Sequence, residues 1–369
     1  MLPVGEARPF VLDGVENVTE VAQLTGPTSP NKTDKYYVAG QDLGSMFEAK
    51  GKTWFVFGDT FGQRDPEMTG GGGGGWRSNT MAYTTDTDPT DGIALDGYIV
   101  DDTNWAKELV PAKQVDGLEI TVIPTYGFSA NDAMYLDYMS VKHWGVPGEW
   151  ETNYSGLAKS TDDGETWQKL AKPRWPGNSN FVQVSVSNVD GVMYFWGVTH
   201  GRFGGVELMK VPEADVERQG AYRYFAGVDD DGAPRWSADM AAAQTIVEGT
   251  VGELSVVWND YLDRWLMTAT DGGAGGGGAT IRESPSPWGP WSDATTLVSQ
   301  SDVRASTRRT CCRITRRTTG GQSFSHCRSG APTTSSGTGR TWSRRRPSTR
   351  LGDESDRTKE IRCVHGADG

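Results

Sequence analysis

The feature that most constrains this chain is a repeated segment in which a turn residue leads into an apolar, aromatic-rich strand. Four such segments recur at irregular intervals of 58 to 80 residues, and each is followed by a second strand-like stretch. The first segments are residues 52–59, 132–139, 190–197 and 263–270, and the second stretches are residues 77–84, 154–159, 205–211 and 279–283. Repeats of this kind are typical of the blades of a β-propeller.

Composition also favours strands over helices. The chain has 369 residues with 48 glycines and 14 tryptophans, and helix-forming runs of Ala, Leu, Glu and Lys are rare. This pattern favours many short strands joined by tight turns. We therefore predict an all-β, five-bladed propeller, with a β-sandwich as the alternative architecture.

Two kinds of membrane-related segment are missing from the sequence. No apolar run reaches the roughly eighteen residues that a transmembrane helix needs, so we predict no membrane span. Residues 1–10 also lack the basic segment and apolar run of a secretory signal peptide.

Charge divides the chain near residue 302. Residues 1–302 carry 21 Lys and Arg against 43 Asp and Glu, whereas residues 303–369 carry 15 against 5. The overall net charge of −12 therefore combines an acidic body with a basic tail. We predict an incomplete propeller domain over residues 1–302, in which the last blade is disrupted, and a basic, largely disordered tail over residues 303–369.

The tail itself can be interpreted in three ways. A basic Arg/Ser/Thr-rich tail is often an arm that binds nucleic acid, but the acidic body argues against a nucleic-acid partner. A zinc ribbon is excluded by spacing, since Cys311 and Cys312 are adjacent and no second Cys-x-x-Cys pair follows. With Cys327 and Cys363, these are all the cysteines of the chain, and the body therefore has no thiol nucleophile.

The third interpretation is translation out of frame, beginning near Val303. With suitable codons, residues 309–312 shifted back by one base read Tyr-Met-Leu. Residues 328–336 then read Leu-Trp-Gly-Pro-Tyr-Asn-Val-Phe, which resembles the strands of the body. Resequencing of the DNA tests this hypothesis, and an intact source frame that encodes the tail would contradict it.

One motif supports the fold without indicating chemistry. Residues 160–167, Ser-Thr-Asp-Asp-Gly-Glu-Thr-Trp, match the Asp-box of sialidase-like propellers. Asp162 and Gly164 suit a tight hairpin turn, and Trp167 is expected to pack on a neighbouring strand. We therefore interpret the motif as structural.

Carboxylates at strand ends are the candidates for catalysis, because a propeller brings strand ends from different blades around one cavity. Asp42 lies among small residues where a strand begins, Asp59 directly follows the apolar run 55–58, and Glu253 interrupts an apolar stretch. Burial against aromatic rings would raise the pKa of a carboxyl such as Asp59, as a general acid requires. The alternatives are a turn residue that caps Thr60 for Asp59 and an edge-strand charge for Glu253.

Three groups of aromatic and polar side chains are candidates for binding a sugar, because rings provide stacking platforms and Arg suits paired acceptors. For each group the alternative is ordinary packing or a surface salt bridge. The groups are Trp76, Arg77 and Asn79; His143, Trp144 and Asn153; and His200 with Arg202. The two histidines are the only ones in residues 1–302 and lack a third ligand at helical spacing, so we predict no metal and no cofactor.

Taken in order, these motifs resemble a formerly uncharacterised actinobacterial family that is now associated with endo-D-arabinanases. The resemblance covers about residues 30–302. It is carried by Asp-Leu-Gly at 42–44, Phe-Gly-Asp-Thr-Phe at 57–61, Trp-Arg-Ser-Asn at 76–79, the Asp-box, Gly-Arg at 201–202, Gly-Glu at 252–253 and Trp-Gly-Pro-Trp-Ser at 288–292.

The resemblance implies a five-bladed propeller that hydrolyses D-arabinofuranosyl linkages, with Asp42 and Asp59 as the paired catalytic carboxylates and Glu253 as a further candidate. It implies a polysaccharide partner, the D-arabinan of arabinogalactan or lipoarabinomannan, and an extracellular or cell-envelope location. A non-catalytic carbohydrate-binding propeller is the alternative.

The chain departs from the family pattern after residue 302. That pattern continues with a Tyr-x-x-Met-Leu-Pro-like stretch and a Trp-Gly-Pro-Tyr-Asn-Val strand, which occur here only in the shifted reading. The closure of the propeller, and with it the activity of this chain, therefore depends on what the tail contributes.

Overall fold

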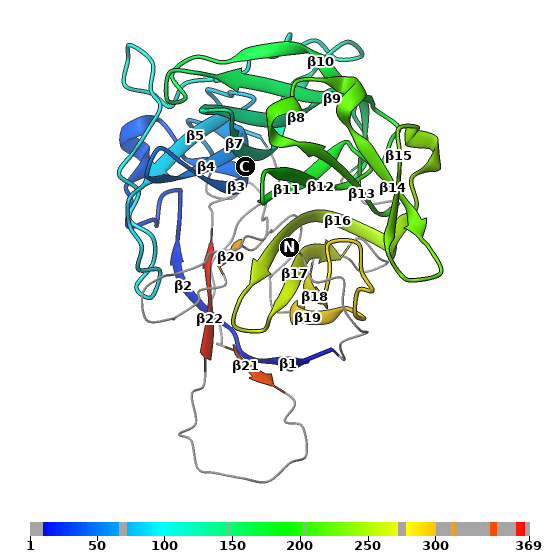
Figure 1. The fold of residues 1–369 in the computed structure, drawn as a ribbon. Helices are drawn as coiled ribbons and strands as arrows, with labels where there is room; N and C mark the ends of the chain where they lie inside the picture. Colours follow the sequence, from blue (N-terminus) through cyan, green and yellow to red (C-terminus); the bar gives the residue numbers. More distant parts are fainter. Residues whose placement is uncertain are drawn as a thin grey trace.

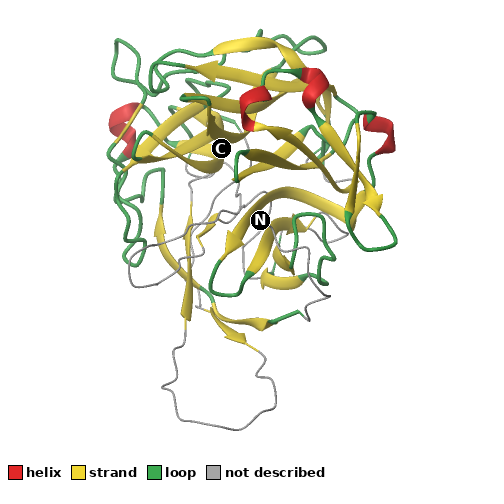
Figure 2. Ribbon diagram, in the orientation of Figure 1, coloured by secondary structure: helices red, strands yellow, loops and turns green. Residues whose placement is uncertain are grey.

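The computed structural model describes residues 10–65, 72–146, 148–201, 204–271 and 278–299, together with the backbone of short strands at 311–313, 340–344 and 359–365. Within these ranges the protein consists of β-strands and four short 3-10 helices (Figures 1 and 2). The 3-10 helices are η1 (Thr33–Tyr36), η2 (Glu213–Asp215), η3 (Gln219–Ala221) and η4 (Met240–Ala242). The described part of the chain has no helix that is long and apolar enough to cross a membrane.

Four antiparallel units, here called blades 1 to 4, follow one another along the chain and surround a common centre (Figure 1). Blade 1 comprises β3 (Gly40–Ala49), β4 (Lys52–Phe61), β5 (Thr80–Thr84) and β6 (Gly97–Tyr98). Blade 2 comprises β7 (Thr121–Ala130), β8 (Ala133–Trp144), β9 (Trp150–Ser160) and β10 (Gln168–Pro176). Blade 3 comprises β11 (Gln183–Val189), β12 (Val192–Val198), β13 (Gly204–Pro212), β14 (Arg223–Val228) and β15 (Pro234–Ser237). Blade 4 comprises β16 (Thr245–Asn259), β17 (Arg264–Asp271), β18 (Ala279–Ser284) and β19 (Thr295–Val298). The pairing of β13 with β16 joins blades 3 and 4 into one nine-stranded sheet.

The first strand of each blade lies at the centre, and the predicted apolar segments are the second strands. Neighbouring inner strands are linked by hydrogen bonds: Val184 N–H on β11 donates to Thr125 Oγ1 on β7 (3.4 Å), and Val256 N–H on β16 donates to Ser185 Oγ on β11 (2.8 Å). The second strands β4, β8, β12 and β17 are buried on both faces between blades, which explains their nearly continuous apolar sequences.

A fifth sheet lies between blade 4 and blade 1. It contains β1 (Leu12–Asn17), β2 (Thr19–Gln23), β20 (Cys311–Arg313), β21 (Arg340–Arg344) and β22 (Lys359–His365). β1 packs on blade 4, where Leu12 and Val15 join a cluster with Leu266 and Ile281. β2 pairs with β22 in parallel, unlike the strands of the four blades. The prediction of an all-β, five-bladed propeller with a disrupted last blade is therefore confirmed.

The predicted domain boundary at residues 302 and 303 and the out-of-frame hypothesis stay predictions. Most of residues 303–369 lie outside the described residues. The backbone of β20, β21 and β22 is described there, and these strands pair with one another and with β1 and β2.

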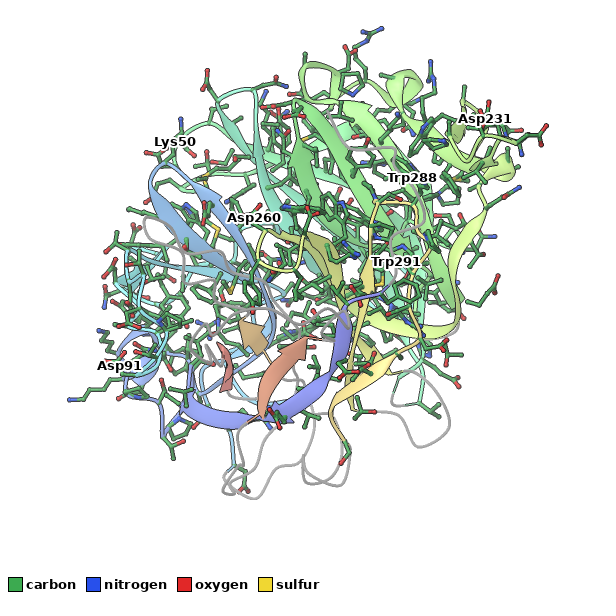
Figure 3. The ribbon with its side chains drawn as sticks, turned by 60° about the horizontal axis from the view of Figure 1, so that its bottom comes forward. Lys50, Asp91, Asp231, Asp260, Trp288 and Trp291 are labelled. Carbon is green, nitrogen blue, oxygen red and sulfur yellow. The ribbon has the colours of Figure 1, made fainter. Side chains whose placement is uncertain are left out.

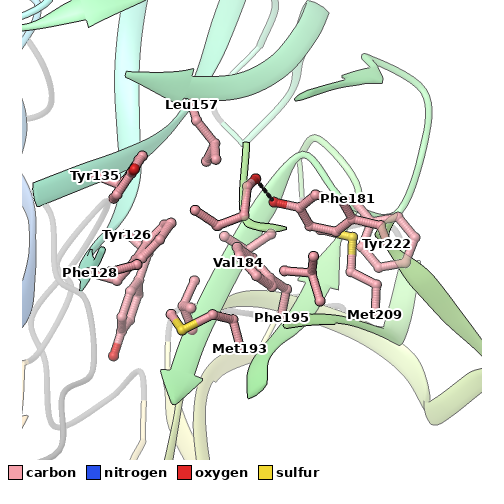
Figure 4. Close-up of a cluster of buried hydrophobic side chains, with 14 of the residues drawn as sticks. Tyr126, Phe128, Tyr135, Leu157, Phe181, Val184, Met193, Phe195, Met209 and Tyr222 are labelled. Carbon is pink, nitrogen blue, oxygen red and sulfur yellow. Dashed lines mark hydrogen bonds between the residues drawn. The ribbon is translucent and has the colours of Figure 1, made fainter. Parts of the chain in front are cut away.

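Hydrophobic clusters between neighbouring blades hold the ring together. Figure 4 shows the cluster between blades 2 and 3, where the rings of Phe128 and Phe195 meet edge to face with their centroids 5.6 Å apart. At its margin Tyr222 donates its hydroxyl to the carbonyl of Val216 (2.7 Å). Such an aromatic pair contributes about 0.5–1.5 kcal/mol beyond the area it buries. The packing between blades thereby fixes how the inner strands face the centre.

The Asp-box forms the turn between β9 and β10, as predicted. Asp162 Oδ1 accepts the backbone N–H of Thr166 (2.9 Å), and Ser160 Oγ accepts the N–H of Gly164 (3.0 Å). Trp167 donates its indole N–H to the carbonyl of Gly164 (2.9 Å) and packs against the core between blades 1 and 2. These contacts stabilise the turn and give the motif a structural role.

Candidate active site

Asp59 lies in a β-bulge at the end of β4. The Cα pairing of β3 with β4 passes from Leu43–Phe57 to Gln41–Thr60, so β4 carries one extra residue over this step. A β-bulge leaves the extra residue unpaired and changes the direction of the neighbouring side chains. The bulge therefore frees Asp59 from the regular alternation of the strand.

The Asp59 carboxylate is held by groups from two blades. Its Oδ1 accepts the indole N–H of Trp76 (2.8 Å), which lies in the segment before β5 of the same blade. The same oxygen accepts the hydroxyl of Thr121 (3.0 Å), at the beginning of β7 in blade 2. Asp59 is half-buried, so its carboxylate is oriented by donors while part of the side chain faces solvent.

Asp42 lies on β3 opposite this bulge. Its carboxylate accepts the backbone N–H of Leu43 (2.6 Å), and the side chain is half-buried. The next two residues have left-handed backbone angles, φ 70° at Leu43 and φ 101° at Gly44. For a side chain such as leucine this conformation costs about 1–3 kcal/mol, and such strain concentrates at functional sites. Asp42 and Asp59 thus occupy paired, irregular strands at the same end of blade 1.

Glu253 occupies a matching bulge in blade 4. The pairing of β16 with β17 passes from Val251–Asp271 to Leu254–Ala269, which leaves one extra residue on β16. Glu253 is only 1% exposed. Both Asp59 and Glu253 therefore follow a glycine inside a bulge of a central strand pair.

A polar hollow of about 260 Å³ adjoins this part of blade 4. Val251 contributes to its wall, together with the hydroxyl-bearing Thr250, Thr270 and Thr280, the carboxylate of Glu248 and the cation of Arg282. Uncharged hydroxyls and one guanidinium can accept and donate hydrogen bonds to the hydroxyls of a sugar.

The second predicted group gathers where β8 ends and β9 begins. His143 Nδ1 lies 2.6 Å from Asp116 Oδ1, and Asn153 donates to the carbonyl of Leu118 (2.8 Å). Trp144 is 37% exposed and meets Trp150 edge to face, with ring centroids 5.8 Å apart. Trp144 therefore gives blade 2 an accessible aromatic surface at the end where β7 begins and Thr121 contacts Asp59.

The third predicted group is only partly described. His200 is half-buried after β12, and its Nδ1 lies 3.2 Å from Thr199 Oγ1. Arg202 lies outside the described residues.

Two residues predicted to bind substrate hold the backbone in this structure. The guanidinium of Arg77 donates to the carbonyls of Ala106 (3.1 Å) and Tyr37 (2.6 Å), and burial lowers the pKa of Arg77. Asn79 is fully buried. Its amide group donates to two backbone carbonyls and accepts two backbone N–H groups, so no hydrogen-bonding capacity remains for a ligand.

Two further carboxyls were not among the predicted site residues. Glu207 on β13 accepts the side-chain amide of Asn180 (2.9 Å), and burial raises the pKa of its carboxyl. Asp137 on β8 is completely buried, accepts the hydroxyl of Thr125 (2.9 Å), and has a pKa raised well above its ordinary value by burial. In the sequence, each of these carboxyls interrupts an apolar strand. The sequence analysis used this feature to select Glu253 and did not select Glu207 or Asp137.

The described residues contain no group of three or more His, Cys, Asp or Glu side chains that could hold a metal ion. Around Asp59, the described residues therefore offer oriented carboxylates, indole rings and hydroxyls for chemistry.

The fold and these residues define a β-propeller with carboxylates placed in strand bulges at one end of its centre. The chain belongs to the family described as "Domain of unknown function (DUF4185)", whose model matches residues 28–307.

Comparison with characterised proteins gives partial matches. The chain is 28% identical over 189 residues to notoamide biosynthesis cluster protein J of Aspergillus sp. (strain MF297-2), covering 49% of this chain and 48% of the relative. The chain thus spans about half the length of this curated relative.

Three solved structures of glycoside-processing enzymes are similar in outline. A xylan β-1,4-xylosidase from Bacillus halodurans C-125 matches with a TM-score of 0.44 and 13% identity, over 83% of this chain and 53% of that chain. An exo-β-1,3-galactanase from Phanerochaete chrysosporium matches with a TM-score of 0.46 and 9% identity, over 76% and 54%. An α-L-arabinofuranosidase from Podospora anserina matches with a TM-score of 0.40 and 11% identity, over 77% and 74%. Similarity at this level does not define the activity of this chain.

Proposed function

We propose that the protein is an endo-acting glycoside hydrolase that cleaves D-arabinofuranosyl linkages, with Asp42 and Asp59 as the reacting carboxyls. One of them protonates the leaving oxygen, and the other acts as base or nucleophile, which is the division of labour that glycoside hydrolysis requires. Glu253 is the third carboxyl assigned to this site.

The observation that carries this proposal is the setting of Asp59. Its carboxylate lies in a bulge, is oriented by Trp76 and Thr121 from two blades, and lies on the strand paired with that of Asp42. Preorganised donors of this kind fix a reacting group before substrate arrives.

The assignment of D-arabinan as substrate rests on the ordered motifs that resemble the endo-D-arabinanase family. With it we propose that the protein acts on the D-arabinan of arabinogalactan or lipoarabinomannan, in the cell envelope or outside the cell. Trp76, Trp144, His143, Asn153, His200 and Arg202 are the proposed contacts to the sugar chain.

The test is digestion of purified D-arabinan by the full chain, followed by chromatography of the released oligosaccharides. Asp59→Asn and Asp42→Asn should each reduce product release by about 10²–10⁴-fold, because a positioned acid or base contributes that much. Asp132→Asn is the matched control, since Asp132 has φ 59° in the turn between β7 and β8, where asparagine is tolerated.

Three outcomes are distinguishable. Oligosaccharide fragments that vanish in both variants support the proposal. Full activity in both variants rejects these residues. Binding of arabinan without fragments from the unaltered chain, or from a chain with the tail in the shifted frame, favours the non-catalytic carbohydrate-binding propeller instead.

A further inference from the structure

A second cavity lies at the opposite end of the inner strands from the candidate active site. It has a volume of about 620 Å³ and is lined by the far ends of the inner strands of all four blades. Figure 3 shows this end, with Lys50 and Asp260 labelled in the turns that follow β3 and β16. Its size falls within the range of about 300–1,000 Å³ that is usual for small-molecule sites.

Polar side chains from three blades lie midway along the inner strands, between the turns at the cavity and the bulges at the candidate active site. Tyr126 lies in the cavity wall, where burial raises the pKa of its hydroxyl while Ser185 on β11 and Ser255 on β16 lower it. These three residues come from three blades and meet near the centre. The residues that line the cavity do not include Asp42, Asp59 or Glu253.

The walls of the cavity are aromatic and apolar. Phe47, Phe128, Met193 and Trp258 come from blades 1, 2, 3 and 4, and Trp258 is half-buried. The edge of the Trp258 indole is fixed by a hydrogen bond to Asp260 Oδ1 (2.7 Å). A rigid ring of this kind presents a flat apolar surface to a ligand at low entropic cost.

One buried donor in the wall has no protein partner. Trp265 is 2% exposed, and its indole N–H makes no hydrogen bond to any described residue. Leaving such a donor unpaired costs about 1–3 kcal/mol. The Nε1 atom is sealed from solvent, so a ligand in the cavity does not reach it and this donor does not select the ligand.

The mouth of the cavity offers acceptors and no cations. Glu48 and Asp190 are exposed there, beside the hydroxyls of Ser129 and Ser187. Among the described residues that line the cavity there is no lysine or arginine. Phosphate and other anions therefore lack a counter-charge, whereas the hydroxyls of a sugar find acceptors in the two carboxylates.

We propose that this cavity is a non-catalytic binding site for a neutral sugar unit of an oligosaccharide. The apolar face of a sugar ring would lie on Trp258, and its hydroxyls would donate to Glu48 and Asp190. The site goes beyond the proposed hydrolysis and requires no participation of Asp59.

The experiment is isothermal titration of the full chain with a linear D-arabinofuranosyl tetrasaccharide and, separately, with xylotetraose, both in the Asp59→Asn background so that the ligand survives. Trp258→Ala should weaken binding at one site by about tenfold, as expected for loss of a stacking ring. Trp236→Ala is the matched control, because Trp236 lies on β15 of blade 3, away from the cavity.

The exposed residues at the mouth provide variants that leave the core packing intact. Glu48→Gln and Asp190→Asn keep the shape of the side chains and should each weaken sugar binding several-fold, with unchanged thermal unfolding. In the enzyme with Asp59 restored, Trp258→Ala should leave the hydrolysis rate of a soluble substrate unchanged, whereas Asp59→Asn should leave the affinity of the cavity unchanged.

Four results would overturn the proposal: sugar binding that is unaffected by Trp258→Ala, Glu48→Gln and Asp190→Asn; no sugar binding at all; tighter binding of inorganic phosphate than of either sugar; or tighter binding of tetramethylammonium than of either sugar. Failure of the proposed hydrolysis is read separately, from the absence of released fragments.

Discussion

The two ends of the central channel are built from the same strands in different ways. At the carboxylate end the strand pairs are irregular, with register shifts between Gln41 and Leu43, and between Val251 and Leu254. At the other end the same pairs run without interruption to their turns, from Ser45 to Ala49 and from Leu254 to Asn259.

This difference shows how one propeller can carry two kinds of surface. A regular strand alternates its side chains, so the uninterrupted end presents apolar and aromatic residues to a cavity. A bulge breaks that alternation and directs a carboxylate where the alternation would not place it. The irregular end is therefore suited to chemistry and the regular end to binding.

The largest expected effect is a separation of function between the ends. Asp59→Asn should abolish most hydrolysis, by about 10²–10⁴-fold, without changing sugar affinity at the far cavity. Trp258→Ala should weaken sugar binding at the far cavity by about tenfold and leave the hydrolysis rate unchanged. Rates of product release and titration of both variants measure this, and loss of both properties in either single variant would show that the two ends act as one site.

The sequence predicted more of the regular end than of the irregular end. Apolar segments such as residues 52–59 are visible because strands buried on both faces have continuous apolar sequences, and they gave the blade repeat. The inner strands were less visible, since strands such as residues 121–130 mix Thr, Pro, Gly and Ser with apolar residues.

Bulges cannot be read directly from the sequence, because their register depends on the partner strand. Asp59 and Glu253 were nevertheless identified as candidates, since Asp59 directly follows an apolar run and Glu253 interrupts an apolar stretch. Asn79 was assigned to the substrate from its neighbours Trp76 and Arg77, but its side chain is turned inward to backbone groups from two segments. Hydrogen bonds from a buried amide to backbone groups far away in the sequence leave no pattern in the neighbouring residues.

A second prediction tests whether the bulge needs its glycine. A Cβ added at Gly58 would lie 3.1 Å from Leu43 Cδ1 and 3.2 Å from Ile123 Cγ2. Gly58→Val should therefore lower the free energy of unfolding by about 1–3 kcal/mol and displace Asp59. Urea unfolding and arabinan digestion measure the two effects.

The control for this variant is Gly220→Ala, because a Cβ at Gly220 meets no atom within 4 Å. Equal stability and activity in Gly58→Val and Gly220→Ala would mean that close packing at the bulge does not position Asp59.

A third prediction concerns the role of Arg77 at the carboxylate end. Arg77→Lys loses the paired donation to the carbonyls of Ala106 and Tyr37, since an ammonium group lacks the planar fork of a guanidinium. We expect a loss of about 1–3 kcal/mol in the free energy of unfolding and little change in KM.

Arg218→Lys provides the comparison, because the Arg218 side chain is 72% exposed in its ion pair with Asp215. A large increase in KM without loss of stability in Arg77→Lys would restore Arg77 as a substrate-binding residue.

The smallest expected effect is a pH dependence of stability that originates in Glu207. Burial raises the pKa of its carboxyl, although the hydrogen bond from Asn180 acts in the opposite direction. The folded protein therefore keeps this proton at pH values where the unfolded chain has released it. The stability that this group contributes is present below its ordinary pKa and is lost as the pH rises through the raised value.

Glu207→Gln removes that loss while its amide oxygen can still accept from Asn180. Between about pH 4 and about pH 7, the free energy of unfolding should therefore decrease less in the variant than in the unaltered protein. Urea unfolding at a series of pH values measures the difference. If the two pH profiles coincide, the buried carboxyl of Glu207 does not link proton binding to folding.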